Sequence, residues 1–320
     1  MVNYGGNMKT VFIINPNAGK ETVKSHLLAE LKAKNIEYHL TEYAGHAKEI
    51  AREIAESGEE VRIFSCGGEG TNYEVLNGIV GKDNVTLGLV PCGTGNDFLK
   101  YFGNNGAFLN LEDQFDGSEF YLDIIKVKAE DREYYGLNSC SAGMDAMVCE
   151  NAIKFKKLPF VNKLSYELAI AKTLLQKFGK KIDFIIDGKE HIGIPSLFAV
   201  CANAPFYGGG YNCAPDANPS DGKLNYSIIA TRSKLRTLTI LGKYKKGTHT
   251  SLKICHHGEC EEMIYKTDSP VAFNIDGEVY KFSDVICSVV SRGVKLWLPK
   301  TVAASHGKLL TPVEKSVVMA

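Results

Sequence analysis

Two glycine-rich turns hold the residues of this chain whose types and spacing could do chemistry. The first spans residues 64–71 and the second spans residues 90–98. Each turn follows an apolar run and precedes a helical pattern. Glycine lets a backbone approach a bulky anion closely, and a helix N-terminus presents unpaired N–H groups at the positive end of its dipole. The pair therefore predicts one phosphate-bearing ligand held from two sides.

Neither turn matches the better-known phosphate-binding motifs. The Gly-Lys-Ser/Thr ending of the P-loop is missing, and neither turn carries the dinucleotide fingerprint in the first strand–helix unit. We therefore expect the phosphates to be held by backbone amides together with Asn15, Asn17, Thr71 and Thr94, without a P-loop lysine.

The elements that must position these turns alternate between strand and helix in the first third of the chain. Strand-like runs cover residues 10–15, 37–42, 61–65 and 86–90, and helical patterns cover residues 21–34 and 47–54. Such alternation with short links predicts a parallel sheet with helices on its faces. Ligands of such sheets bind beyond the carboxyl ends of the strands, where both glycine turns and a third turn at residues 15–19 are expected.

The pattern changes after about residue 121, where strand-like segments become dominant. They cover residues 122–128, 181–186, 197–202, 224–230, 271–275 and 285–290, with one long helical stretch at 162–178. Asp-Gly pairs at 187–188 and 276–277 are hairpin signals. We predict a second, mostly antiparallel β domain over residues 122–299, after an α/β domain over residues 1–121 to which residues 300–320 could return.

Composition narrows the class of protein. The 320 residues contain 37 basic and 37 acidic side chains, so the formal net charge is zero and the whole molecule is not an electrostatic nucleic-acid binder. The nine cysteines follow no regular framework, which favours a reducing, cytoplasmic compartment. We see neither a signal peptide nor an apolar run long enough for a transmembrane segment.

Several motifs in order resemble the diacylglycerol kinase catalytic family, in its bacterial lipid-kinase branch, which is related to the sphingosine kinases. In the first half they are Asn15-Pro16-Asn17-Ala18-Gly19, Gly67-Gly68-Glu69-Gly70-Thr71 and Pro91-Cys92-Gly93-Thr94-Gly95-Asn96-Asp97-Phe98. In the second half they are residues 138–148, 207–211, 221–224 and 274–278. The match covers about residues 9–299, and the ordered series is far more specific than any single motif.

The resemblance implies a Rossmann-like, NAD-kinase-like α/β domain followed by a β-sandwich domain, with ATP in the cleft between them. It also implies transfer of the γ-phosphoryl group to a lipid hydroxyl. Glu278 would be the general base, with Asp276 and Glu69 as further catalytic acids, and Asn218, Asp221 and Lys223 would hold a structural magnesium ion. The implied nucleotide-binding residues are Asn15, Pro16, Asn17, Ala18, Gly19, Thr41, Gly67, Gly68, Gly70, Thr71, Asn72, Glu74, Thr94 and Asp97.

Three positions depart from the family pattern. Glu69 stands where the family has Asp, Tyr73 where it has Asn, and Asn225 where it has Asp. The first two fall in the nucleotide site, so one alternative is a weakly active or non-catalytic nucleotide- or lipid-binding homologue. The other is an NAD kinase-like small-molecule kinase, which shares the Gly-Gly-acidic-Gly-Thr turn.

The lipid acceptor is the broadest open question. Diacylglycerol is our first expectation, with sphingoid bases, monoacylglycerol and phosphatidylglycerol open, because headgroup specificity depends on pocket shape. The enzyme would visit the membrane surface transiently, and a homodimer is left open. Basic residues at 232–246 would either contact anionic headgroups or form a solvated face. A zinc site at 255–260 is disfavoured, because adjacent histidines on a strand point to opposite faces.

Overall fold

The chain folds into two compact units. The computed structural model describes residues 8–19, 21–93, 95–103, 106–156, 165–230 and 233–313. One unit comprises residues 1–123 and 291–320, and the other comprises residues 124–290. We call them the α/β unit and the β-rich unit and describe each by itself.

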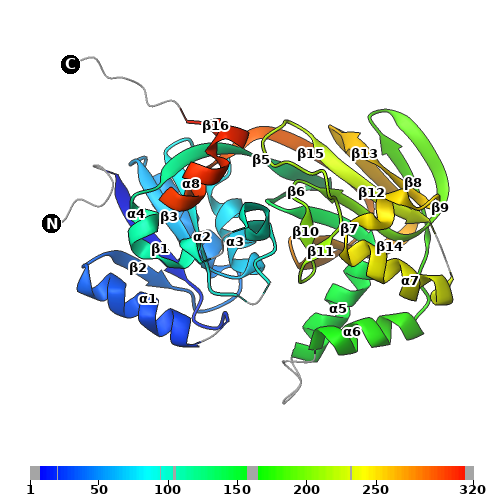
Figure 1. The fold of residues 1–320 in the computed structure, drawn as a ribbon, viewed down its shortest axis with the longest axis horizontal. Helices are drawn as coiled ribbons and strands as arrows, with labels where there is room; N and C mark the ends of the chain where they lie inside the picture. Colours follow the sequence, from blue (N-terminus) through cyan, green and yellow to red (C-terminus); the bar gives the residue numbers. More distant parts are fainter. Residues whose placement is uncertain are drawn as a thin grey trace. The chain divides into compact units, whose positions relative to one another are not determined.

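The α/β unit begins with alternating strands and helices, drawn in blue to cyan in Figure 1. Its elements are β1 (Lys9–Ile14), α1 (Glu21–Ala33), β2 (Glu37–Leu40), α2 (His46–Glu56), β3 (Val61–Gly67), α3 (Glu69–Ile79), β4 (Val85–Pro91), the 3-10 helices η1 (Phe98–Phe102) and η2 (Ala107–Leu109), α4 (Leu111–Phe115), α8 (Lys300–His306), η4 (Gly307–Leu309) and β16 (Thr311–Pro312). Strands β5 (Ser118–Ala129) and β15 (Glu278–Leu298) each cross the boundary between the units along the chain.

Strands of the α/β unit pair in parallel. β1 lies between β2 and β3, β4 pairs with β3, and the last residues of β15 pair in parallel with β4. The carboxyl ends of β1, β3 and β4 therefore meet at one edge, and each is followed by one of the three predicted turns. The C-terminal segment also belongs to this unit, because β16 pairs antiparallel with β5.

Buried aromatic and aliphatic side chains hold this sheet against its helices. Phe12 and Phe64 stack with ring centroids 4.6 Å apart, and Leu27 and Leu31 of α1 belong to the same core cluster. The β-branched runs of β1 and β3 make these strands fully buried over most of their length, as expected of a sheet covered on both faces. The sheet edge that carries the three turns is thus a firmly packed platform.

The β-rich unit consists of strands and three longer helices. Its elements are β6 (Arg132–Gly136), β7 (Ser139–Gly143), α5 (Met144–Lys156), α6 (Ser165–Leu175), β8 (Lys181–Ile186), β9 (Lys189–Ala202), β10 (Phe206–Tyr207), β11 (Tyr211–Asn212), β12 (Leu224–Ala230), α7 (Lys234–Lys245), η3 (Thr248–Ser251), β13 (Cys255–Cys260) and β14 (Glu262–Ile275), with most of β15. All strand pairs within it are antiparallel among the described residues, in the order β13-β12-β9-β7-β14-β15, with β8 beside β9 and β14. The predicted antiparallel character of the second half is confirmed.

Both predicted Asp-Gly hairpins are confirmed as well. Asp187 and Gly188, with φ of 45° and 79°, join β8 to β9, and Asp276 and Gly277, with φ of 48° and 95°, join β14 to β15. Positive φ at both central residues is the geometry of the type I′ turn, which suits the twist of paired strands.

The helices of this unit are only partly as expected. α6 lies within the predicted helical stretch of residues 162–178, whose first residues are outside the described part of the chain. α5 was not expected from the sequence: it begins at Met144, directly after Gly143 with its φ of 121°. Among the described helices, none combines the length and apolar character needed to cross a bilayer. All nine cysteines are unpaired thiols, seven of them buried.

Candidate functional site

The turn after β1 packs against the other two turns of the α/β unit. The Asn15 side chain donates a hydrogen bond to Thr71 Oγ1 at 3.1 Å, which links the turn after β1 to α3. Gly19, with φ of 61°, lies so close to the main chain of Cys92 that a Cβ there would stand 1.4 Å from the Cys92 carbonyl oxygen. The three turns predicted from separate stretches of sequence therefore meet in one place.

Local hydrogen bonds shape the turn after β1. Its backbone folds back because the amides of Asn17 and Ala18 donate to the side-chain and main-chain oxygens of Asn15, at 2.9 and 3.2 Å. The amide of buried Thr41 donates to the Ile14 carbonyl at 2.9 Å, so the residue after β2 is fixed beside this turn.

The turn after β4 is hydrogen-bonded to the turn after β3. The amides of Cys92 and Gly93 both donate to the Gly67 carbonyl, at 3.0 and 2.9 Å. The Asp97 amide donates to Glu69 Oε1 at 3.1 Å, so the glutamate that departs from the family pattern reaches across to the second turn. These three amides are engaged within the protein, so they fix the turn after β4 against the turn after β3 and the start of α3.

The N-terminus of α3 has no side-chain cap. Gly68 is its N-cap residue, so the first helical turn presents its amides at the positive end of the helix dipole without a capping side chain. Glycine is required at position 67, since a Cβ there would lie 2.2 Å from Thr71 Oγ1. Gly70 lies in the first turn of this helix, and Thr94 lies outside the described residues.

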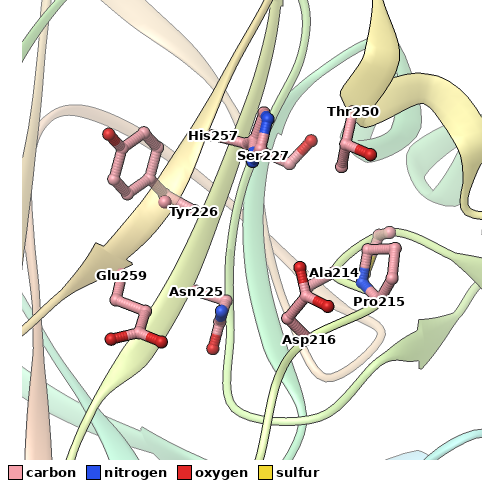
Figure 2. A pocket seen from close by; sticks show the side chains of 11 residues that line it. Ala214, Pro215, Asp216, Asn225, Tyr226, Ser227, Thr250, His257 and Glu259 are labelled. Carbon is pink, nitrogen blue, oxygen red and sulfur yellow. The ribbon is translucent and has the colours of Figure 1, made fainter.

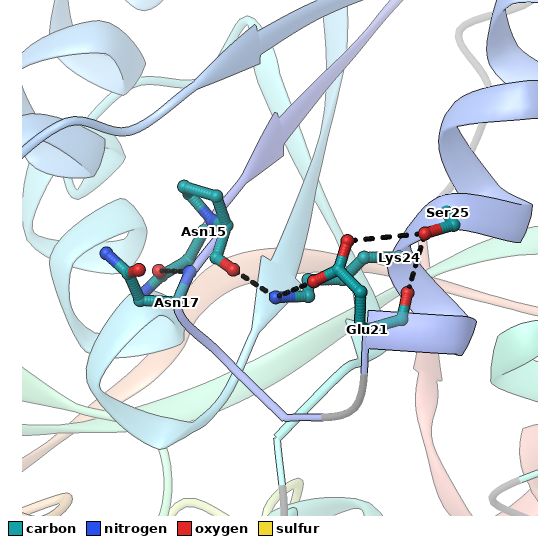
Figure 3. A network of polar contacts seen from close by, with 6 residues as sticks. Asn15, Asn17, Glu21, Lys24 and Ser25 are labelled. Carbon is teal, nitrogen blue, oxygen red and sulfur yellow. Dashed lines mark hydrogen bonds and ion pairs between the residues drawn. The ribbon is translucent and has the colours of Figure 1, made fainter.

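Two lysines neutralise charge around the turns. The ammonium of Lys24 donates to the Pro16 carbonyl and pairs with Glu21 at 3.1 Å, as Figure 3 shows, although this lysine is only 5% exposed. Lys100 forms an ion pair with the buried carboxylate of Asp97. Lys24 was missed in the sequence analysis, although its position three residues before Leu27 places it on the buried stripe of α1.

Two further predicted nucleotide-binding residues have structural partners. The Glu74 carboxylate accepts hydrogen bonds from the amides of Gly45 and Ala47, at 2.8 and 3.1 Å, and so caps the start of α2. Asn72 Oδ1 accepts a hydrogen bond from the Ser65 hydroxyl at 2.7 Å. Both residues hold the frame of the site, because their side-chain oxygens accept hydrogen bonds from other parts of the protein.

The second group of predicted residues lies in the β-rich unit, at the hairpin between β14 and β15. The buried Asp276 carboxylate accepts hydrogen bonds from three consecutive amides, those of Leu137 (2.5 Å), Asn138 (3.1 Å) and Ser139 (2.8 Å). Burial raises the pKa of Asp276 to about 6, although the three amides oppose the shift. This carboxylate fixes the hairpin to the segment before β7.

Glu278 differs from Asp276 in its surroundings. It is the first residue of β15, pairs with Ile275 across the turn and is exposed. The hairpin thus combines a buried carboxylate that anchors the backbone with an exposed carboxylate held at a defined position. Of the two carboxylates, only that of Glu278 belongs to an exposed residue.

The predicted magnesium loop lies between β11 and β12. Asn218 Oδ1 accepts from the Ser220 amide at 3.2 Å, and Asp221 Oδ1 accepts from the Lys223 amide at 3.0 Å. The Lys223 ammonium pairs with Glu259 at 2.7 Å, so this residue could offer a cation only its carbonyl oxygen. The donors are all oxygens, which suits magnesium. Across the described ranges, no three His, Cys, Asp or Glu side chains form a metal-binding group.

A pocket of about 350 Å³ opens beside this loop, and it contains none of the predicted site residues. Figure 2 shows its polar lining, made by Asp216, Asn225, Ser227, Thr250, His257 and Glu259. Strands β12 and β13 supply four of these residues, because Asn225 pairs with Glu259 and Ser227 with His257 across the ladder.

Asp145 is a buried acid that the sequence analysis did not select. It is the second residue of α5, and Tyr207 donates a hydrogen bond to its carboxylate at 3.1 Å. Burial raises its pKa to about 6, in spite of hydrogen bonds from Ser141, the Ala146 amide and Tyr207. The only available signal was an acidic residue after a glycine within an apolar stretch, and this pattern is common at helix starts.

Comparison with known proteins gives the same family over both halves of the chain. Residues 9–127 match the diacylglycerol kinase catalytic domain, and residues 138–297 match the YegS C-terminal NAD kinase beta sandwich-like domain. The Bacillus subtilis protein named "Putative lipid kinase YtlR" is 29% identical over 84% of this chain and 92% of its own length. The Staphylococcus haemolyticus protein named "Putative lipid kinase SH2167" is 31% identical over 73% of this chain and 75% of its own.

Solved structures share the fold. A diacylglycerol kinase structure from Bacillus anthracis superposes with a TM-score of 0.64 at 17% identity, covering 92% of this chain and 98% of its own. Another from the same organism, described as "a putative diacylglycerol kinase", reaches a TM-score of 0.71 at 19% identity with the same coverage. Both halves of the chain thus have counterparts in one known architecture.

Proposed function

Because the chain belongs to the diacylglycerol kinase catalytic-domain family, we propose that it is an ATP- and magnesium-dependent lipid kinase that transfers the γ-phosphoryl group to a lipid hydroxyl. The observation that carries the proposal is the meeting of three turns at the uncapped start of α3. Phosphoryl transfer depends on positioning and charge neutralisation, which an amide-rich helix start supplies.

In this proposal the turn after β3 binds the phosphates, and the turn after β4 holds it in position. The amides at the start of α3 hold the ATP phosphates, while the turn after β4, through the amides of Gly93 and Asp97, keeps that helix start in place. The amide contacts of Asn15 and Asn17 fold the turn after β1 around the same ligand. Lys24 and Lys100 reduce the negative charge that the ligand would meet.

Glu278 is the general base that takes the proton of the attacking hydroxyl. It is exposed and anchored at the first position of β15, whereas Asp276 is buried and engaged by three amides. We therefore assign Asp276 a positioning role, in which it fixes the hairpin that presents Glu278. A base held at one place contributes about a hundredfold to ten-thousandfold in such reactions.

Magnesium enters the proposal in two places. Asn218, Asp221 and the Lys223 carbonyl would hold a structural ion, which would stabilise the loop before β12. A magnesium ion bound with ATP supplies charge neutralisation on the phosphates. The protein's own contribution is the amide-rich start of α3 and the carboxylates around it.

The proposed acceptor is diacylglycerol, which would give phosphatidic acid. The similar proteins are named putative lipid kinases, which supports the lipid class, and the similar solved structures are described as diacylglycerol kinases, which supports this acceptor. The enzyme would act in the cytoplasm and bind the membrane surface transiently to reach its substrate.

A lipid panel tests the proposal. Purified full-length protein with radiolabelled Mg-ATP is presented with diacylglycerol, monoacylglycerol, a sphingoid base, phosphatidylglycerol and, separately, NAD. We expect label in phosphatidic acid, lost on chelation of magnesium. Labelled NAD alone would favour an NAD kinase-like enzyme, and no labelled product would leave a nucleotide- or lipid-binding homologue.

Gly93→Ala tests the nucleotide part by itself. A Cβ at position 93 would lie 2.6 Å from the Gly68 Cα, so the turn must shift and ATP binding should weaken. The matched control is Gly242→Ala in α7, where nothing lies within 4 Å of the added Cβ. Equal ATP affinity of both variants, measured by calorimetry, would remove this turn from the site.

A further inference from the structure

A long stretch of the β-rich unit contains no acidic residue. From Gly222 to Gly258 there are eight lysines and arginines and not one Asp or Glu, in a chain whose basic and acidic residues balance at 37 each. Charge is thus segregated within a protein that is neutral overall. Helix α7 lies in the middle of this stretch and is drawn in yellow in Figure 1.

The two faces of α7 differ sharply. Thr237, Ile240 and Tyr244 are at most 4% exposed, and Tyr244 stacks on Phe198 with ring centroids 4.5 Å apart. This face anchors the helix on the core of the β-rich unit. The helix position and orientation are therefore fixed from within the unit, and its other face is free to serve a different purpose.

The outward face is basic with one apolar side chain in it. Arg236, Lys243 and Lys245 are exposed, and Leu238 is 60% exposed. At 100° per residue Leu238 and Lys245 lie about 160° and 140° from Ile240, and Arg236 and Lys243 lie about 40° and 60° from it, along one edge of the buried stripe. The remaining exposed positions of this face are Thr239 and Gly242, which are small.

The charges of this face are not neutralised within the described part of the chain. The structure records no ion pair there for Arg236, Lys243 or Lys245, whereas lysines elsewhere, such as Lys126 and Lys154, pair with carboxylates at 2.6 and 2.8 Å. An unneutralised basic face attracts an anionic partner by charge complementarity.

We propose that the outward face of α7 docks on an anionic phospholipid bilayer. A helix with Lys and Arg on the polar face and an exposed leucine is suited to the membrane interface, where the apolar side chain enters below the headgroups. A nucleic acid would use the charges but would leave Leu238 in water. The inference deepens the proposed lipid kinase function, because it names the surface through which the enzyme meets its substrate.

Vesicle binding without ATP tests this surface. Full-length protein is sedimented with phosphatidylcholine vesicles, with or without phosphatidylglycerol. We expect binding to the anionic vesicles only, reduced by added salt. The triple variant R236Q/K243Q/K245Q should bind roughly a hundredfold more weakly, since each charge near such a surface contributes about 1 kcal/mol. Leu238→Ala should weaken binding a few-fold without changing its salt dependence.

The matched control is the triple variant K48Q/K82Q/K189Q, which removes the same charge from exposed lysines outside α7. It should bind like the wild type. Equal loss in both triple variants, equal binding of neutral and anionic vesicles, or tighter binding of duplex RNA than of anionic vesicles through the same residues would each overturn the proposal. Thermal unfolding verifies that both triple variants are folded.

The failure of this inference is separable from that of the proposed function. Turnover on a short-chain diacylglycerol dissolved as monomers should be the same in the α7 variant and the wild type. Vesicle binding by a protein that phosphorylates no lipid would refute the kinase and leave the docking surface standing. Kinase activity on monomers without vesicle binding would refute the docking surface and support the kinase.

Discussion

The two Asp-Gly hairpins of the β-rich unit are the same turn placed in different surroundings. Asp187 and Asp276 have nearly equal φ, each is followed by a left-handed glycine, and each carboxylate accepts backbone amides from a distant segment. Asp187 is exposed and its turn is followed by Lys189; Asp276 is buried and its turn is followed by Glu278. Local sequence makes the turn, and burial and the next residue decide what the turn can do.

Substituting the residue after each turn should give the largest difference in turnover between the two hairpins. Glu278→Gln keeps the size of the side chain and removes the base, so turnover should fall by about a hundredfold to ten-thousandfold while ATP binding is retained. The equivalent change after the other turn, Lys189→Gln, should leave turnover unchanged. Phosphoryl transfer to diacylglycerol and calorimetric ATP binding measure the two quantities, and robust turnover of Glu278→Gln would exclude it as the base.

The aspartates themselves should differ in stability. Asp276→Asn places an amide group against three backbone donors in a buried site, and we expect unfolding free energy to fall by about 3 kcal/mol. Asp187→Asn disturbs two amide contacts at an exposed turn and should cost less than about 1 kcal/mol. Urea unfolding compares them, and equal losses would show that burial does not separate the hairpins.

Burial of Asp276 also has a pH signature. Burial raises its pKa in the folded protein to about 6, well above the ordinary value of an aspartate, so the native state binds the proton more tightly than the unfolded chain. The unfolding free energy contributed by this group therefore falls as pH rises from about 4 to 6, by about 1–3 kcal/mol. Asp145, with its pKa also raised to about 6, adds a change of the same sign.

Urea unfolding at several pH values measures this slope. Asp145→Asn should reduce the slope of the unfolding free energy against pH by the contribution of Asp145. Adding Asp276→Asn should reduce the slope further. The assignment would be contradicted if the unfolding free energy changed between pH 4 and 6 by the same amount in the wild type and in both variants.

The smallest expected effect concerns the glycine of the exposed hairpin. Nothing lies within 4 Å of a Cβ added to Gly188, whose φ is 79°, so Gly188→Ala should cost only the conformational strain, about 1 kcal/mol. Gly188→Asn should recover most of that loss, because asparagine tolerates the left-handed region. Thermal unfolding measures both, and equal stability of the alanine variant and the wild type would show that the turn changes shape.

Short-range patterns made much of this fold predictable. The apolar runs that became β1, β3 and β4, the Asp-Gly turns and the helical stripe of Leu27 and Leu31 follow directly from residue periodicity. The predicted role of Glu278 rests on the family resemblance and stays a prediction. Periodicity alone does not say which acid at a turn is buried.

Long-range packing limited what the sequence could give. Arg62 is almost fully buried, with its guanidinium carbon 3.2 Å from the centroid of a Trp297 ring more than two hundred positions away. Lys24 is buried because carbonyl and carboxylate partners satisfy its charge. The engaged amides of Cys92 and Gly93 depend on how the two turns stack. Each of these features arises from tertiary contact, which residue spacing does not encode.

The free thiols distributed through both units equip the protein with its own reporters of local opening. Cys66 and Cys92 lie by the turns of the α/β unit, and Cys140, Cys201 and Cys287 lie in the β-rich unit, all at most 3% exposed. Burial raises the pKa of the Cys92 thiol to about 11, so a thiol reagent would modify it only when its surroundings open. Labelling rates followed by mass spectrometry would therefore report the breathing of each unit separately, and a nucleotide seated against the turns would slow the reaction at Cys92.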